Sequence, residues 1–132
     1  MTPHAATYDA TTPAKAVERL SARLSAGDLE GALACYEPRA CFRPSPEGPP
    51  VHGIEAIRQA LRGFLALSPT LMGRVERVLE ADGVALLVNR WRLRGTGGDG
   101  RPVELGGLSA DVLRRRADGT WAILVDDPWG GG

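Results

Sequence analysis

The stretch LMGRVERVLEA-DG-VALLVNRWRLR, residues 71–94, places an Asp-Gly pair between two apolar, β-prone runs. Asp82 and Gly83 are the residue types that a two-residue type I′ turn requires, because both central positions need a positive φ angle. The flanking runs, residues 71–81 and 84–94, are therefore predicted to be the two antiparallel strands of a hairpin.

The same pattern continues towards the C-terminus. Residues 95–101 form a Gly-rich turn, and residues 102–116 follow it as a long predicted strand. A second Asp-Gly turn at 118–119 leads into the last predicted strand, residues 120–127. Strands joined in sequence by short turns favour an antiparallel meander over a parallel sheet.

The first half of the chain has helical spacing instead. Apolar residues repeat every three or four positions in residues 14–26, 29–36 and 54–67, and residues 40–43 are a short candidate strand. A sheet of four long strands must bury one of its faces. The sequence therefore predicts an α+β fold, in which three N-terminal helices pack on a curved antiparallel sheet with a pocket between the layers.

Composition limits the classes of protein to consider. The 132 residues suit a single domain, predicted here over residues 13–130 after a mobile tail at 1–12. The 16 Lys and Arg residues balance the 16 Asp and Glu residues, which argues against nucleic acid as a partner. No apolar run is long enough to span a membrane, and the N-terminus lacks the apolar core of a signal peptide. We therefore expect a cytoplasmic protein without a membrane partner.

Three segments resemble the NTF2-like superfamily and, within it, the SnoaL-like proteins. Residues 24–33 are similar to the opening helix-turn-helix of the family, and residues 51–58 are similar to the G-x-x-A-I-R start of its third helix. Residues 114–130, with the motifs DGTW and DDPWG, most resemble the SgcJ/EcaC-type subgroup. The resemblance covers residues 14–130, and the order and spacing of the segments carry it.

The resemblance implies a cone-shaped barrel, in which a curved sheet wraps round the helices, and a homodimer formed through the outer face of the sheet. The superfamily includes ketosteroid isomerases, polyketide cyclases and epoxide hydrolases, as well as pocket proteins without a known reaction. A hydrophobic small molecule in secondary metabolism is therefore the implied ligand. The sequence has no cofactor motif and no metal-ligand spacing, so we expect neither a cofactor nor a metal.

Two acidic residues on the last two predicted strands are the candidate catalytic groups. If Asp118-Gly119 is a two-residue loop, Asp111 lies opposite Asp126, with the side chains about 5 Å apart on one face. Two adjacent carboxylates repel, so one is expected to have a raised pKa and to hold a proton, as a general acid does. Alternatively, a one-residue change of register would separate the two, or nearby arginines would satisfy them.

Ketosteroid isomerase offers a partial match to these residues. Counted back from the same turn, Asp111 corresponds to the aspartic acid that this enzyme keeps protonated in its oxyanion hole. The general-base Asp of the family falls near Pro44 and its oxyanion-hole Tyr near Leu20, and neither side chain can perform those roles. Steroid isomerase activity is therefore not expected.

The first hairpin predicts further pocket residues. With a two-residue loop at 82–83, Glu76 faces Asn89, and Arg74 faces Trp91, unless a β-bulge changes the pairing. A flat indole with one N–H donor suits a ring-shaped apolar ligand, although a core position is the alternative for Trp91. Asn89 is predicted to face the same pocket, where a buried amide needs partners.

Other candidates come from the aromatic residues and the second hairpin. Tyr36, at the end of the second predicted helix, is expected to reach the pocket with its hydroxyl, and Trp129 is expected to plug the mouth. Trp121 is expected on the outer face, and Asp127 is expected to point outward or to cap the turn before Pro128. The complete set of predicted ligand contacts is Tyr36, Phe42, Asn89, Trp91, Leu113, Leu124 and Trp129, with Leu113 expected opposite Leu124.

These features leave three functions open. The first is a cofactor-independent acid–base enzyme of isomerase, cyclase or hydrolase type, in which Asp111 and Asp126 act on an apolar substrate. The second is a non-catalytic carrier of a hydrophobic small molecule, which the missing base and tyrosine favour. The third is a protein-interaction domain that uses its outer sheet face, for which a filled cone without a cavity is expected.

Overall fold

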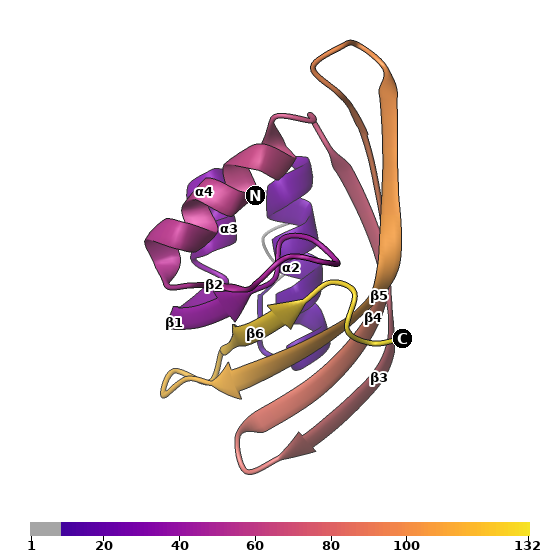
Figure 1. Cartoon of the computed structure of the whole chain (residues 1–132). Coiled ribbons are helices and arrows are strands. Elements are labelled where there is room, and N and C mark those ends of the chain that lie inside the picture. Colours follow the sequence, from indigo (N-terminus) through magenta and orange to yellow (C-terminus); the bar gives the residue numbers. More distant parts are fainter. Residues whose placement is uncertain (1–8) are drawn as a thin grey trace, which may run out of the picture.

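The computed structural model describes residues 9–132 and has an α+β fold (Figure 1). Within these residues the strands form one six-stranded sheet in the order β2-β1-β6-β5-β4-β3. Figure 1 shows that β3, β4 and β5 bend strongly and that the helices lie on the concave side of the sheet. In chain order the elements are α2 (Pro13–Ser25), α3 (Leu29–Leu33), β1 (Tyr36–Phe42), β2 (Val51–His52), α4 (Ile54–Leu65), β3 (Thr70–Ala81), β4 (Val84–Thr96), β5 (Pro102–Arg115) and β6 (Trp121–Asp127).

Capping residues determine where the first helices begin. Thr12 accepts a hydrogen bond from the amide of Lys15 at the start of α2, and Asp28 accepts one from the amide of Gly31 at the start of α3. Gly27, with a φ of 72°, adopts the left-handed conformation that commonly follows a helix. The apolar faces of the longer helices then enter the core through Val17, Leu20 and Leu24 of α2 and Ile57 and Leu61 of α4.

The turn between β3 and β4 is the predicted type. Asp82 and Gly83 have φ angles of 52° and 74°, and both positive values match a type I′ hairpin. A β-bulge follows in β3, between Val75 and Arg77. The Asp-Gly pair therefore fixes the existence of the hairpin, while the bulge changes its register.

The predicted partners of Asn89 and Trp91 are wrong because this bulge inserts one residue into β3. Asn89 pairs with Val75 and not with Glu76. Trp91 pairs with Gly73, one residue before its predicted partner. Both side chains nevertheless lie on the concave face, where the family resemblance implied them.

The prediction of three N-terminal helices on a cone-shaped barrel is not confirmed in that form. Helix α4 follows β1 and β2, so helices and strands alternate in the first half of the chain. Tyr36 starts strand β1, which lies parallel to β6, whereas the sequence predicted helix up to this residue. The sheet also has two free edges, β2 and β3, so it is curved but not closed.

The described N-terminal residues pack against the core. Residues 1–8 of the predicted mobile tail lie outside the described residues, but Ala10 is only 3% exposed, and its carbonyl accepts a hydrogen bond from the Trp121 amide. Trp121 is itself 4% exposed, so its predicted place on the outer face is wrong. It pairs with Arg115 because the turn between β5 and β6 has one residue more than predicted.

Leu87 tests the described core. Its side chain is fully buried in β4, so Leu87→Ala should lower the free energy of unfolding by about 2–5 kcal/mol through lost contacts and a new cavity. Leu105 of β5 is 36% exposed and is the matched control, for which Leu105→Ala should cost less than about 1 kcal/mol. Urea unfolding followed by circular dichroism measures both, and equal losses would contradict this burial.

Candidate functional site

The helices and the concave face of the sheet enclose an apolar cavity with a volume of about 90 Å³. Ligand sites usually measure about 300–1,000 Å³, so this space holds only about three water molecules. Its apolar wall comes mostly from Val17, Leu20, Leu24, Leu61, Phe64 and Leu93. Its polar groups, apart from Ser21 of α2, come from the strands, namely Tyr36, Asn89, Ser109, Asp111 and Asp126.

Asp111 of β5 and Asp126 of β6 are paired across the sheet, as predicted. This pairing results from two one-residue changes of register, one in the turn and one in β6, that cancel each other. The turn has three residues and not two, because the Arg116 amide donates to the Thr120 carbonyl at 2.7 Å. A β-bulge at Leu124 then returns the register to the predicted pair.

The structure does not place Leu113 and Leu124 at the cavity. Because Leu124 is the extra residue of the bulge, Leu113 pairs with Ile123, and the predicted Leu113–Leu124 pair is wrong. Ile123 lines the cavity in place of Leu124. Leu113 is 0% exposed and lies in the core behind the cavity wall.

Tyr36 makes the strongest contact with the acidic pair. Its hydroxyl donates a hydrogen bond to Asp126 Oδ2 at 2.7 Å, which the parallel pairing of β1 with β6 permits. Burial raises the pKa of Tyr36 well above its usual value, and the neighbouring Asp126 charge raises it further. The tyrosine therefore remains a hydrogen-bond donor, reaching the cavity as predicted but from a strand.

Asp111 is the member of the pair whose pKa is raised more. Ser109 Oγ donates to Asp111 Oδ2 at 3.1 Å, whereas Oδ1 is buried and has no donor among residues 9–132. Burial raises the pKa of Asp111 well above its ordinary value, and the charge of Asp126 raises it further. A proton on Asp111 allows it to donate a hydrogen bond to the Asp126 carboxylate.

Asp126 is the member of the pair whose pKa is raised less. Burial raises its pKa, but hydrogen bonds from Asp111 and Tyr36 oppose that change by stabilising the carboxylate. The nearby charge of Asp127 acts in the same direction as burial. These directions favour a proton on Asp111 beside an ionised Asp126, and a neutral acid beside an ionised carboxylate is the arrangement that general acid–base chemistry uses.

The other predicted residues close one side of this cavity. Phe42, Asn89, Trp91 and Trp129 all line it. The Trp91 indole N–H donates to the Pro128 carbonyl at 2.6 Å, and the Trp91 and Trp129 rings meet edge to face with centroids 5.7 Å apart. Trp129 therefore lies at the cavity, as the sequence predicted.

Sequence analysis missed Ser109, which is 4% exposed and bonded to Asp111. Since Ser109 lies two residues before Asp111 on one strand, the alternation of β5 alone could have placed both on the same face. It also missed Arg43, whose Nη2 lies 2.8 Å from Asp127 Oδ1. The same Asp127 oxygen accepts a bond from the Trp129 amide at 3.3 Å, which confirms its predicted role as a turn cap.

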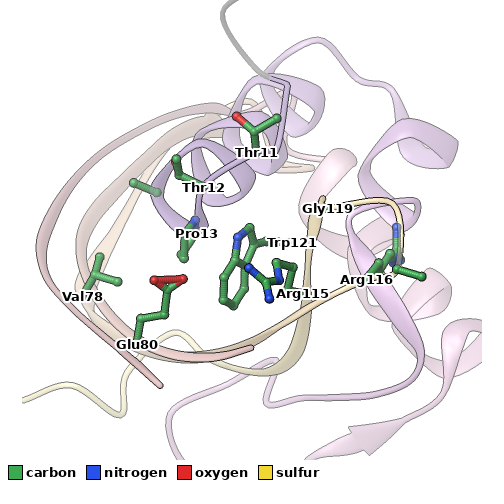
Figure 2. A pocket seen from close by; sticks show the side chains of 11 residues that line it. Thr11, Thr12, Pro13, Val78, Glu80, Arg115, Arg116, Gly119 and Trp121 are labelled. Carbon is green, nitrogen blue, oxygen red and sulfur yellow. The ribbon is translucent and has the colours of Figure 1, made fainter. Parts of the chain in front are cut away.

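A wider hollow of about 940 Å³ lies beside the start of α2. Figure 2 shows Pro13, Glu80, Arg115 and Trp121 round this space. Glu80 and Arg115 are exposed to water, whereas Asp111 and Asp126 are both buried. The smaller cavity therefore has the stronger case as a chemical site.

Metal and membrane features can be stated for the described part of the chain. Residues 9–132 contain no group of three or more His, Cys, Asp or Glu side chains placed to hold a metal ion. Cys35 and Cys41 are free thiols. None of the helices described here has the length and apolar character needed to cross a bilayer.

Comparison with known families identifies the domain. The model of the SnoaL-like domain matches residues 17–123, which contain most of the cavity wall. The chain belongs to the SnoaL-like domain family. No functionally curated protein matches this SnoaL-like domain significantly.

Solved structures show that the SnoaL-like domain shares its fold with NTF2-like and ketosteroid isomerase-like proteins. A conserved protein from Planctomyces limnophilus matches with a TM-score of 0.77 and 17% identity, covering 86% of this chain and 88% of that one. A ketosteroid isomerase-like protein from Erwinia carotovora atroseptica has a TM-score of 0.74 and 14% identity over 96% and 95%. An NTF2-like protein from Streptomyces avermitilis, proposed to be a dehydratase, has a TM-score of 0.73 and 17% identity over 95% of both chains. These likenesses show the fold.

Asp111→Asn tests the shared proton. Because the folded protein keeps this proton to a higher pH than the unfolded chain does, wild-type stability should fall as the pH rises above about 4. The asparagine variant lacks that carboxyl, so its stability relative to wild type should increase by roughly 1–3 kcal/mol between pH 4 and pH 8. Urea unfolding across this range measures the difference.

Asp99→Asn is the matched control, because the Asp99 side chain is 65% exposed. Its stability should follow the wild-type pH dependence closely. If Asp111→Asn also ran parallel to wild type, the carboxyl pair would hold no extra proton.

Proposed function

We propose that this SnoaL-like domain is a cofactor-independent acid–base enzyme that acts on a small, mostly apolar molecule. One observation carries the proposal: Asp111 and Asp126 are paired on adjacent strands and buried on the wall of an apolar cavity, and Tyr36 donates a hydrogen bond to Asp126. Burial matters because proton transfer groups act most strongly where water is excluded.

The proposed reaction uses the two carboxyl groups in opposite roles. Asp126 accepts a proton from a carbon beside a carbonyl group of the substrate, and Asp111 gives its proton to the carbonyl oxygen. The electron pair of the broken C–H bond forms the enol double bond, so no oxidant or reductant is needed. The pair again holds one proton afterwards, and the reverse transfers at another position complete an isomerisation.

Other residues of the cavity position these groups and the substrate. Tyr36 and Ser109 fix the orientation of the two carboxyl groups through the hydrogen bonds described above. Asn89 and Trp91 are proposed to orient the substrate, with the indole as a flat wall. Leu20, at the position of the oxyanion-hole tyrosine of ketosteroid isomerase, lines the cavity as an apolar contact. Steroid isomerisation is therefore not proposed.

The SgcJ/EcaC-type resemblance supports a place in secondary metabolism. Proteins of that type suggest a setting such as polyketide or enediyne assembly. This setting agrees with the apolar wall of the cavity and with the single acid–base pair.

A non-catalytic carrier is the second candidate. The observation that favours it is the lack of a base at the position of Pro44, where ketosteroid isomerase has one. Without that group, the carboxyl pair could serve only to hydrogen-bond a ligand in the cavity. Binding without proton exchange distinguishes the carrier from the enzyme.

Proton exchange on 2-tetralone tests the proposed chemistry. This bicyclic ketone has C–H bonds beside its carbonyl, and in D₂O the wild-type protein should accelerate deuterium incorporation there, as followed by proton NMR. Asp126→Asn should slow the exchange by roughly 10²–10⁴-fold and Asp111→Asn should slow it as well, because each removes a proton-transfer group. Tyr36→Phe should cause a smaller loss.

Asp99→Asn serves again as the exposed control and should retain full exchange activity. Tight binding of 2-tetralone with no exchange above the buffer rate would contradict the enzyme and support the carrier. Full activity in both aspartate variants would exclude the pair from the chemistry.

We also propose that the outer face of the sheet forms a homodimer. Leu79, Val84 and Leu86 lie on this face and are 58%, 45% and 41% exposed. Leu79 and Leu86 are paired across β3 and β4, so their side chains form a continuous apolar surface. A second copy of the chain would bury this surface and exclude water from it.

Leu86→Arg tests the dimer. The wild-type protein should sediment as a dimer and the variant as a monomer, because a charge cannot be buried unpaired in an apolar interface. Leu105→Arg is the control, since Leu105 is 36% exposed but pairs with the cavity residue Leu93 and so lies on the other face. A monomeric wild-type protein in analytical ultracentrifugation would refute the proposal.

A further inference from the structure

The C-terminal residues 128–132, called the strap here, run along the free edge of β5. Strand β6 ends where Asp127 pairs with Ala110, and β5 continues beyond that point without a partner on this side. The strap takes this place, and the Gly131 amide donates to the Leu108 carbonyl at 2.8 Å. Figure 1 shows the end of the chain beside β5.

The strap brings one large aromatic side chain into the site. Trp129 packs edge to face against Trp91, with a ring-centroid distance of 5.7 Å and an interplanar angle of 72°. Trp91 also holds the strap directly through its bond to the Pro128 carbonyl at 2.6 Å. One cavity residue therefore contacts both the backbone and the side chain of the strap.

Gly107 makes room for this arrangement. It is the partner of Trp91 across β4 and β5, and a Cβ atom at Gly107 would lie 3.0 Å from Trp129 Cδ1 and 3.2 Å from the Pro128 carbonyl oxygen. Any larger residue would push the indole and the strap away from Trp91. The absence of a side chain at Gly107 therefore leaves room for the Trp129 indole.

Beyond Asp127, the strap is joined to the sheet by one backbone hydrogen bond, from Gly131 to Leu108, and by its contacts with Trp91. Its base is fixed by the ion pair of Arg43 with Asp127, but beyond that point the contacts described above are few. Segments with few contacts open at a much lower cost than global unfolding. The strap can therefore move while the carboxyl pair, buried between β1, β5 and β6, stays in place.

The closed cavity is too small for the ligand that its walls suit. At about 90 Å³ it has no room for a ring system. Trp129 lines this same cavity, so displacing its indole adds the space that the indole fills to the cavity. The space beside Trp91 would then fit a flat ring, with Tyr36, Asp126 and Asp111 lining the same cavity to meet a polar atom at the edge of that ring.

We propose that the indole of Trp129 occupies the ligand site in the closed protein, and that the ligand is a flat bicyclic molecule with one oxygen, which displaces the strap and packs against Trp91. This inference rests on the proposed function for the role of the carboxyl pair. Trp129 is then a residue that sets which ligands are admitted, because a ligand must compete with it.

Free indole is the probe for the first test. Trp129→Ala leaves a space of the same shape, so calorimetric titration should show indole binding at least tenfold more tightly to this variant than to wild type. Trp129→Phe refills the space with a ring and should bind indole close to the wild-type level. Equal affinities of wild type and Trp129→Ala, with both folded by circular dichroism, would overturn the proposal.

Gly107→Ala provides a second, independent variant. The added methyl group displaces Trp129 without removing it, so indole affinity should again rise above that of wild type. An affinity no higher than that of wild type, in a folded variant, would show that the room left by Gly107 is not what keeps Trp129 in the ligand site.

Hydrogen exchange tests the displacement in the wild-type protein, with 2-naphthol as a bicyclic probe that carries one hydroxyl. At saturating 2-naphthol, mass spectrometry should show faster exchange in the C-terminal peptide that contains Gly131, and unchanged exchange in β4. Slower exchange in that peptide would mean that the ligand enters beneath a closed strap and would overturn the proposal.

The experiments can overturn the strap proposal without overturning the enzyme proposal, and the reverse. Tighter indole binding by Trp129→Ala, together with no catalysed exchange on 2-tetralone, supports the strap and overturns the enzyme. Catalysed exchange by wild type, together with unchanged indole affinity in Trp129→Ala and Gly107→Ala, overturns the strap and leaves the enzyme standing.

Discussion

The contact between Asp111 and Asp126 depends on the position of β6 in the sheet. This strand lies between β5 and β1, so one neighbour presents Asp111 to it and the other presents Tyr36. Two buried carboxylates could not remain charged side by side, and a single shared proton removes that repulsion. The hydrogen bond from Tyr36 then stabilises the one remaining charge on Asp126. The chemistry of the site therefore follows from strand order and burial together.

The apolar surroundings determine how the Asp111–Asp126 pair is protonated. The helices cover it with leucines and Phe64, so water contributes little to the stability of either charge. These surroundings favour one protonated and one ionised carboxyl over two charged ones. The tryptophan pair at the edge of the same cavity limits its volume and, in the account given above, selects the ligand.

Local sequence signals predicted the strands and turns well, and non-local pairings poorly. The Asp82-Gly83 turn could be found from its turn residues. The bulges in β3 and at Leu124 carry no clear signal in their own residues, because a bulge is set by the packing of the whole sheet. The parallel pairing of β1 with β6 joins residues about 85 positions apart, and Tyr36 was therefore assigned to a helix. The Asp pair was predicted only because two errors of register cancelled.

The protonation state of the pair is the most direct test of this account. Carbon-13 NMR of protein labelled at the aspartate carboxyl carbons reports which of these groups hold a proton at pH 7. The account predicts one protonated carboxyl signal that disappears in Asp111→Asn, with the remaining aspartates ionised. A spectrum in which all aspartate carboxyls are ionised at pH 7 would contradict it.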